Sequence, residues 1–210
     1  MHRWHSILRP RLSRGQASSL LPVVCDWTAS CKRRSPVPAR DQVAHSVHFH
    51  LSLWPHEDGD LGRWMQWLLT SHVRRHRKRH GGSGHIWQGR FKAFPAQSDP
   101  HLHAVLRYVE RNPLRSGLVR RAQDWAWSSL AHRSGGRRPF CLQEGPAPRP
   151  RPWVDYVNLP QTEDELEMLR RSMARGTPFG ELEWIRRTAR RLGLEYTLNP
   201  RGRPCKEAKK

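Results

Sequence analysis

Residues 48–55 have the sequence His-Phe-His-Leu-Ser-Leu-Trp-Pro, in which polar and apolar residues alternate. The alternation predicts a β-strand over residues 45–54, because every second side chain of a strand points to the same face. His48 and His50 then lie next to each other on the polar face. Two imidazoles so placed can hold a divalent metal ion together with an oxygen ligand. Two exposed histidines would give the same pattern, and the pair alone does not decide between these interpretations.

A long helix is predicted after this strand, over residues 61–80. Asp60 is placed to cap the helix, and a Gly-Gly pair at 81–82 is placed to end it. The apolar side chains recur at helical spacing: Leu61, Trp64, Met65, Leu68, Leu69 and His72. The last turns carry a run of cations: Arg74, Arg75, Arg77, Lys78 and Arg79. A run of one charge sign without acids favours contact with DNA phosphates over a merely solvated face.

A second helix is predicted to begin near residues 99–100. We expect it to end at residues 111–112, because Pro113 disfavours helix in the residue before it. Its predicted buried face consists of Leu102, Val105, Leu106 and Val109. Tyr108 and Asn112 are four residues apart and therefore share one face. Tyrosine can act as a covalent nucleophile and an asparagine oxygen can bind a metal, although a core tyrosine would give the same pattern.

The overall charge points to a polyanionic partner. Lysine and arginine number 38 against 18 acids, which gives a formal net charge of +20. Nucleic acid fits this charge better than a membrane does, and no run of about 18 apolar residues predicts a transmembrane helix. The four cysteines are scattered without a C-x-x-C pair, which argues against a zinc ribbon and suits unpaired thiols in a reducing cytoplasm.

Composition divides the chain into four parts. Residues 1–44 are basic, contain several prolines and show no sustained period, and we expect them to be disordered. Residues 45–134 contain the strand and helices described above and form the expected catalytic domain. Residues 135–153 are rich in proline and glycine and are expected to be an extended linker. Residues 154–210 are expected to be a helical, basic, DNA-binding tail.

Further cations are candidates for DNA contact outside the first helix. Arg186 and Arg187 lie on a predicted helix of the tail, and Arg90 lies in the loop after residue 83. Arg201 and Arg203 belong to an Arg-Gly-Arg-Pro sequence, which has the form of an AT-hook core that enters the minor groove. Nearby, Trp87 and Phe91 are candidates either for stacking on bases or for the core.

Three stretches closely resemble the REP-associated tyrosine transposases, relatives of bacterial insertion-sequence transposases with a single tyrosine and an HUH metal motif. The first is residues 48–55. The second is residues 84–91, Gly-His-Ile-Trp-Gln-Gly-Arg-Phe, and the third is residues 107–119, Arg-Tyr-Val-Glu-Arg-Asn-Pro-Leu-Arg-Ser-Gly-Leu-Val. The tail through residues 201–204 is also similar to that of family members.

The resemblance implies an α+β fold with an RRM/ferredoxin-like antiparallel sheet and helices on one face. It implies that His48 and His50 bind Mg²⁺ or Mn²⁺, with Asn112 as a third ligand where relatives commonly have glutamine. It implies that Tyr108 cuts single-stranded DNA as the nucleophile of an endonuclease and strand transferase. The intermediate would be a 5′-phosphotyrosine, and the substrate would be hairpin DNA of repetitive extragenic palindromes.

The amino-terminal part departs from the family. Relatives begin with a strand and a helix and carry Met-Pro-Asn before the first motif histidine, whereas residues 45–47 here are His-Ser-Val. We therefore expect the sheet to lack an edge strand and a covering helix. A catalytically inactive DNA-binding relative, or a truncated or frameshifted remnant, is the alternative to an active enzyme. The resemblance leaves monomer and dimer open.

Overall fold

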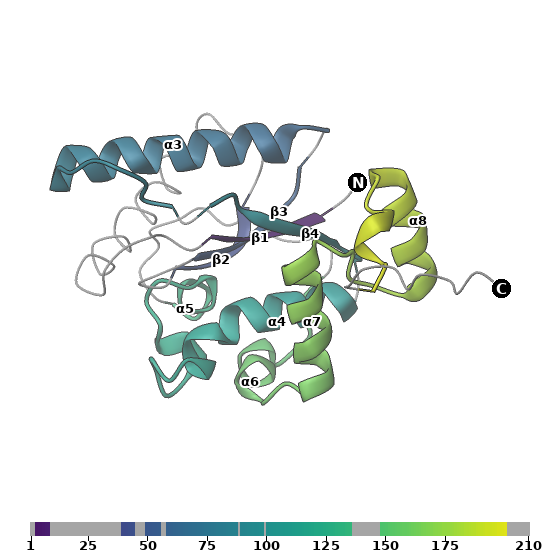
Figure 1. Cartoon of the computed structure of the whole chain (residues 1–210). Coiled ribbons are helices and arrows are strands. Elements are labelled where there is room, and N and C mark those ends of the chain that lie inside the picture. Colours follow the sequence, from purple (N-terminus) through teal and green to yellow (C-terminus); the bar gives the residue numbers. More distant parts are fainter. Residues whose placement is uncertain are drawn as a thin grey trace.

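The chain forms a four-stranded antiparallel sheet with helices on both faces (Figure 1). This computed structural model describes residues 3–8, 39–44, 49–55, 58–87, 89–98, 100–135 and 148–200, the first two ranges as backbone alone. The strands are β1 (Arg3–Leu8), β2 (Ala39–Ala44), β3 (Phe49–Leu53) and β4 (Lys92–Ala96). The helices are α3 (Asp60–His80), α4 (Pro100–Arg115), α5 (Ser129–Arg133), α6 (Trp153–Asn158), α7 (Glu163–Arg175) and α8 (Leu182–Leu192), with 3-10 turns at Ala122–Asp124 and Glu195–Thr197. The α+β class agrees with the prediction.

The strand β1 lies inside the sheet, whose order is β2-β3-β1-β4. It pairs with β3 from Trp4 opposite Leu53 to Leu8 opposite Phe49, and β4 pairs with its other side. The expectation that residues 1–44 have no regular structure is therefore wrong for β1 and β2. The reason is that β1 is held by backbone hydrogen bonds to two strands distant in sequence, which leave no alternation in its own residues.

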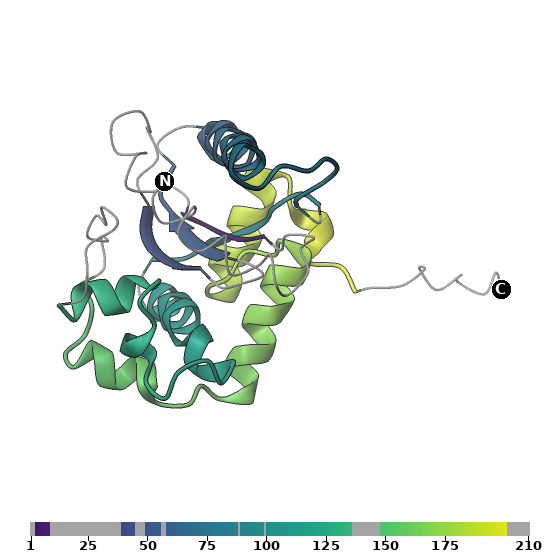
Figure 2. The ribbon, with the colours of Figure 1, turned by 90° about the vertical axis from the view of Figure 1, so that its left-hand side faces the viewer.

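Both faces of the sheet are buried. All five residues of β3 are buried, and its three apolar residues pack with α3 in one core cluster. On the other face, Phe94 and Ala96 of β4 pack with α4 and α7. Figures 1 and 2 show α3 above the sheet and α4 below it. The expectation of helices on one face is thus wrong, because the polar residues His50 and Ser52 are buried beneath α4 instead of facing solvent.

Helix α3 closely matches its predicted range. It begins at Asp60, one residue earlier than predicted, and the preceding Gly59 has a left-handed φ of 86°. Asp60 is therefore the first helical residue and does not cap the helix with its side chain; it forms an ion pair of 2.7 Å with Arg63. Gly81 ends the helix as predicted, with φ 69° and its N–H bonded to the carbonyl of Arg77 at 2.8 Å.

Helix α4 continues past Pro113 to Arg115, which corrects the predicted end at residues 111–112. A proline removes one helical hydrogen bond, but here it lies in the last turn. The bonds resume at once, since Ser116 N–H donates to the carbonyl of Asn112 at 2.9 Å. Asn112 is consequently held in helical geometry one turn after Tyr108. The predicted buried face of α4 is buried in full.

The helices after the proline-rich stretch pack on the compact part of the chain. Trp153 and Val157 of α6 share a core cluster with apolar residues of α4. Three buried residues of α7 share another cluster with Phe94 and Tyr108. At the end of α7, Phe179 forms a parallel bridge with Ala96 and extends the sheet edge by one residue.

The amino terminus of α7 confirms its predicted capping box. The Thr162 side chain accepts from the N–H of Glu165 at 3.2 Å, and the Glu165 carboxylate accepts from the N–H of Thr162 at 3.3 Å. The AT-hook-like residues Arg201 and Arg203 lie outside the described residues. Among the residues that the structure describes, no helix is long and apolar enough to span a membrane.

Candidate functional site

His50, Tyr108 and Asn112 meet between the sheet and α4. Nε2 of His50 and Nδ2 of Asn112 are 2.9 Å apart. The rings of His50 and Tyr108 are edge to face, with centroids separated by 6.1 Å and an interplanar angle of 80°. Two of the residues come from α4 and one from β3, so the site depends on how the helix lies against the strand.

Local structure explains this meeting. His50 is the second residue of β3, and the alternation of the strand turns it away from the α3 face. Tyr108 and Asn112 are one helical turn apart on α4, and both are buried. His50 is also buried, with 2% of its surface exposed. A buried imidazole needs polar partners, and the amide of Asn112 supplies one.

The surroundings of Tyr108 are half cationic and half apolar. The guanidinium of Arg115 lies 4.2 Å from the centroid of the phenol ring, a cation–π contact. The other side of the ring belongs to the core cluster with Phe94 and residues of α7. Only 6% of the surface of Tyr108 is exposed. The nearby cation would favour negative charge at the site, whereas the packing of α7 limits access to it.

The donor set fits a small divalent cation. Cis ligands at about 2.1 Å from an octahedral ion lie about 3 Å apart, and the polar atoms of His50 and Asn112 are 2.9 Å apart. The Asn112 amide would turn over to present Oδ1, which now accepts from Ser116 Oγ at 3.3 Å. His48 lies outside the described residues. Within the described part of the chain, no three His, Cys, Asp or Glu side chains form a metal-binding group.

Glu110, which sequence analysis did not single out, is a buried junction between three helices. Its carboxylate accepts from Ser129 Oγ and from Trp153 Nε1, each at 2.6 Å, and forms an ion pair of 3.4 Å with Arg133. The residue is 0% exposed. It holds α5 and α6 against α4 and thereby fixes the helix that carries Tyr108. A charged residue inside an apolar helical face was the signal available in the sequence.

Two arginines of α4 serve the fold. Arg107 donates to the carbonyls of Leu159 at 2.8 Å and Pro160 at 2.7 Å. Arg111 donates to the carbonyls of Val157, at 3.1 Å, and Asn158 at the end of α6. Guanidinium groups at a helix carboxyl end satisfy its unpaired carbonyls and its negative dipole. These cations bind the polypeptide itself and are not offered to DNA.

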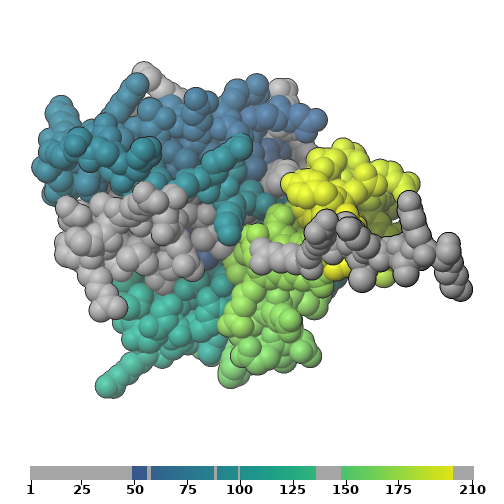
Figure 3. Space-filling model, in the orientation of Figure 1, coloured from purple at the N-terminus to yellow at the C-terminus, as the bar shows by residue number. Residues whose placement is uncertain are grey.

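The cations predicted to bind DNA lie in separate regions. The five at the end of α3, residues 74–79, are all exposed, and Arg77 also donates to the carbonyl of Gly84 at 2.5 Å. Arg186 and Arg187 are exposed on α8. The carboxyl end of α3 and helix α8 lie at opposite ends of the molecule (Figures 1 and 3). The structure does not bring these two groups together.

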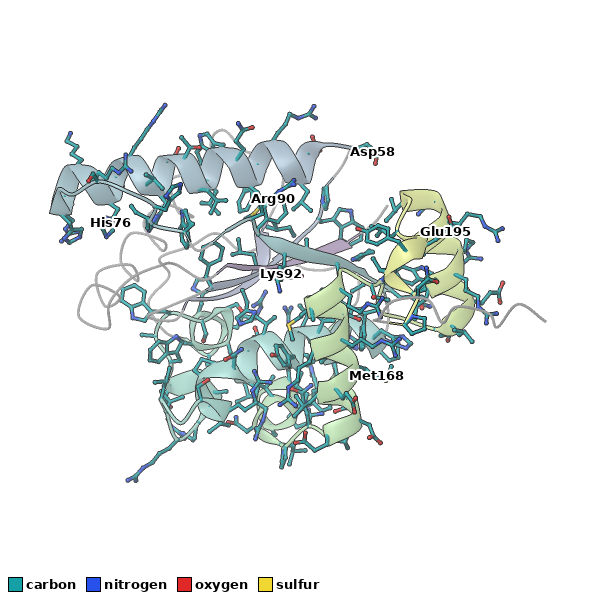
Figure 4. The ribbon with its side chains drawn as sticks, viewed as in Figure 1. Asp58, His76, Arg90, Lys92, Met168 and Glu195 are labelled. Carbon is teal, nitrogen blue, oxygen red and sulfur yellow. The ribbon has the colours of Figure 1, made fainter. Side chains whose placement is uncertain are left out.

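The loop before β4 contributes one exposed cation between these regions. Arg90 is exposed, as is Lys92 at the start of β4, and both lie near the middle of the molecule (Figure 4). Trp87 and Phe91, the aromatic candidates for base stacking, pack against the core cluster of α3. The ring of Trp87 meets Phe49 edge to face with centroids 5.5 Å apart. The core interpretation of these two residues is therefore the better one.

Comparison with known proteins gives one similar solved structure to describe. No family model matches the chain, and no curated protein matches it. A REP-associated tyrosine transposase, solved bound to a REP hairpin, is similar at 19% sequence identity and a TM-score of 0.49. The match covers 68% of this chain and 86% of that one.

Proposed function

We propose that this chain is a DNA-processing enzyme that cuts and rejoins single-stranded DNA through Tyr108. The observation that carries the proposal is the meeting of His50, Asn112 and Tyr108, with 2.9 Å between the polar atoms of the first two. A core tyrosine alone does not require a buried histidine and amide beside it. The resemblance of residues 48–55 and 107–119 to the tyrosine transposases assigns the same residues.

Tyr108 would act as the nucleophile. Its Oη attacks the phosphorus of a phosphodiester, the bond to O3′ breaks, and a 5′-phosphotyrosine and a free 3′-hydroxyl result. The phenolic proton leaves to solvent and O3′ takes up a proton, so no external energy source is needed. Attack by another 3′-hydroxyl reverses the step and joins a new strand. Arg115, next to the Tyr108 ring, stabilises charge that develops at the phosphate and the phenol oxygen.

His50 and Asn112, with His48 as the resemblance implies, would hold Mg²⁺ or Mn²⁺. Such an ion polarises the scissile phosphate and neutralises charge that develops on it. The chain's own contribution is placement, because His50 and Asn112 are fixed by burial between the sheet and α4. An RRM-like sheet, as the resemblance implies, is the scaffold of this proposal.

The DNA would be a hairpin with a single-stranded flank. The exposed cations at the end of α3 and those of α8 offer two phosphate-binding regions at opposite ends of the molecule. Two distant regions suit a substrate that extends across the site. Arg90 lies between them and would contact the strand near the centre of the molecule.

A covalent-adduct assay tests this function. The purified chain is incubated with Mg²⁺ and a labelled hairpin oligonucleotide, and protein-linked label is measured on a denaturing gel. We expect an adduct from the wild type and from Tyr196→Phe, whose tyrosine is 67% exposed on the surface. Tyr108→Phe should give none. A folded wild type that forms no adduct with any hairpin would rule the proposal out.

A DNA-binding protein without catalysis is the second candidate. The observation that favours it is the packing of α7 against Tyr108, which leaves 6% of the residue exposed. This function predicts salt-dependent DNA binding that is unchanged in His50→Ala, together with the absence of an adduct. Failure to bind DNA at low salt would eliminate both candidates and leave a non-functional remnant.

A further inference from the structure

Three histidines lie along one face of α3, four residues apart: His72, His76 and His80. Residues four apart on a helix are neighbours on its surface. The ring centroids of His76 and His80 are 4.7 Å apart, and those of His72 and His76 are 6.0 Å apart. Figure 4 shows His76 pointing from the carboxyl half of the helix away from solvent above α3. None of the three belongs to the Tyr108 site.

The inner two of these histidines are buried without hydrogen bonds. His72 is 2% exposed and His76 is 6% exposed. Among the described residues, neither ring nitrogen of either side chain has a hydrogen-bond partner. Buried nitrogens of this kind are uncommon, and an ion or water that completes them is a standard explanation.

The histidines are also in the correct protonation state for ligation. Burial lowers the pKa of His72 to about 4, with a smaller contribution from His76. Burial and the neighbouring His80 lower the pKa of His76 as well. Both imidazoles are therefore neutral near pH 7, and neutral imidazole is the form that binds metals.

We propose that His76 and His80 form a chelating pair for a transition-metal ion of the Zn²⁺, Ni²⁺ or Cu²⁺ class. With metal–nitrogen bonds of about 2.0–2.1 Å, two imidazoles on one tetrahedral ion have centroids about 5 Å apart. The 4.7 Å separation fits this geometry, whereas the 6.0 Å separation from His72 to His76 is wider. Paired histidines at i and i+4 of a helix are an established arrangement for zinc.

His72 takes a packing role behind this pair. Its ring lies 4.7 Å from that of Trp87, in the interior of the α3 face. The described residues offer no group of three His, Cys, Asp or Glu ligands, so water completes the coordination shell beside the exposed His80. The ion would link two turns at the basic end of α3.

The neighbouring cations determine which ions can bind. Five lysine and arginine residues occupy positions 74–79 of the same helix. Their charge opposes any cation, so hard ions that bind imidazole weakly, such as Mg²⁺, are excluded. Ions that bind nitrogen strongly overcome this repulsion, in the order Cu²⁺ above Ni²⁺ and Zn²⁺.

Zn²⁺ titration of the full, untagged chain tests the proposal. Zinc is competed against a chromogenic chelator in excess Mg²⁺, without DNA, so the result is independent of DNA cutting. The variants are His76→Gln, His80→Gln and, to remove the Tyr108-site ligand, His50→Ala. His101→Gln on α4 is the matched control.

We expect His50→Ala and His101→Gln to keep a Zn²⁺ site that His80→Gln weakens at least about tenfold. Zinc should raise the Tm of His50→Ala but not of the double variant with His80→Gln. Because His80 is exposed, its replacement leaves folding intact even if His76→Gln does not fold. Equal zinc affinity in His80→Gln and His101→Gln would overturn the proposal.

Discussion

Asn112 is the residue on which the geometry of the candidate site depends. Its amide lies 2.9 Å from His50 Nε2 and also accepts from Ser116, so one side chain joins the sheet to the end of α4. The spacing of Tyr108 and Asn112 predicted their shared face from the sequence. Their approach to His50 could not be predicted by spacing alone, because it depends on tertiary packing of α4 against β3.

Replacing Asn112 should lower stability. Asn112→Ala leaves the buried Nε2 of His50 without this partner, and an unsatisfied buried group costs about 1–3 kcal/mol. Urea denaturation followed by tryptophan fluorescence measures the free energy of unfolding. Asn199→Ala, at an exposed position, is the control and should change it by less than about 0.5 kcal/mol. Equal midpoints for the two variants would contradict the contact.

The buried His72 should make stability depend on pH. Burial lowers its pKa from 6.5 to about 4, so the unfolded chain binds a proton that the folded chain does not. Stability due to His72 is complete above pH 6.5, falls as the pH drops towards 4 and then levels. His72→Leu should flatten the dependence of the urea midpoint on pH in this window, whereas His85→Leu, at an exposed position, should not. An unchanged slope in His72→Leu would contradict this assignment.

At the scale of elements, the long helices were predictable and the ends of one were not. The apolar stripe and the Gly-Gly pair defined α3 within one residue. In α4, the rule that helices end before proline failed, because Pro113 falls in the last turn and is itself buried. The strand β1 had no pattern of its own, since its formation depends on β3 and β4.

The basic end of α3 should contribute to DNA affinity through charge alone. Arg74, Lys78 and Arg79 are exposed, and each phosphate that their removal leaves without a cation should reduce the slope of log K against log salt by about 0.9 on duplex DNA. Fluorescence anisotropy across a salt series, on the triple alanine variant, measures the slope. Arg170→Ala, exposed on α7, is the matched control. A slope equal to that of the control would remove α3 from the interface.

At the scale of the whole molecule, the amino-terminal strands and carboxyl-terminal helices complete one structure. β1 lies between β3 and β4, and α6 and α7 share core clusters with α4 and β4. Composition predicted segments at 1–44 and 135–153, yet the strands and helices around them pack together. Packing between segments distant in sequence is the information that composition does not carry.

A chain that begins at residue 45 should not fold cooperatively. Without β1, the strand β4 loses its pairing to the rest of the sheet, because β1 joins it to β3. Removal of residues 201–210, outside the described part, is the control truncation and should leave the transition in place. A thermal melt followed by circular dichroism distinguishes them. A cooperative melt of the 45–210 chain would show that β1 and β2 are dispensable.

The most direct test of the account is the site of DNA attachment. The chain has three tyrosines, Tyr108, Tyr156 and Tyr196. After reaction with a hairpin oligonucleotide and nuclease trimming, trypsin releases Tyr108 in the peptide Tyr-Val-Glu-Arg, residues 108–111. Mass spectrometry should find the residual nucleotide on this peptide, in a Mg²⁺- or Mn²⁺-dependent manner. Attachment to either other tyrosine, or no attachment by the folded chain, would contradict the assignment of Tyr108 as nucleophile.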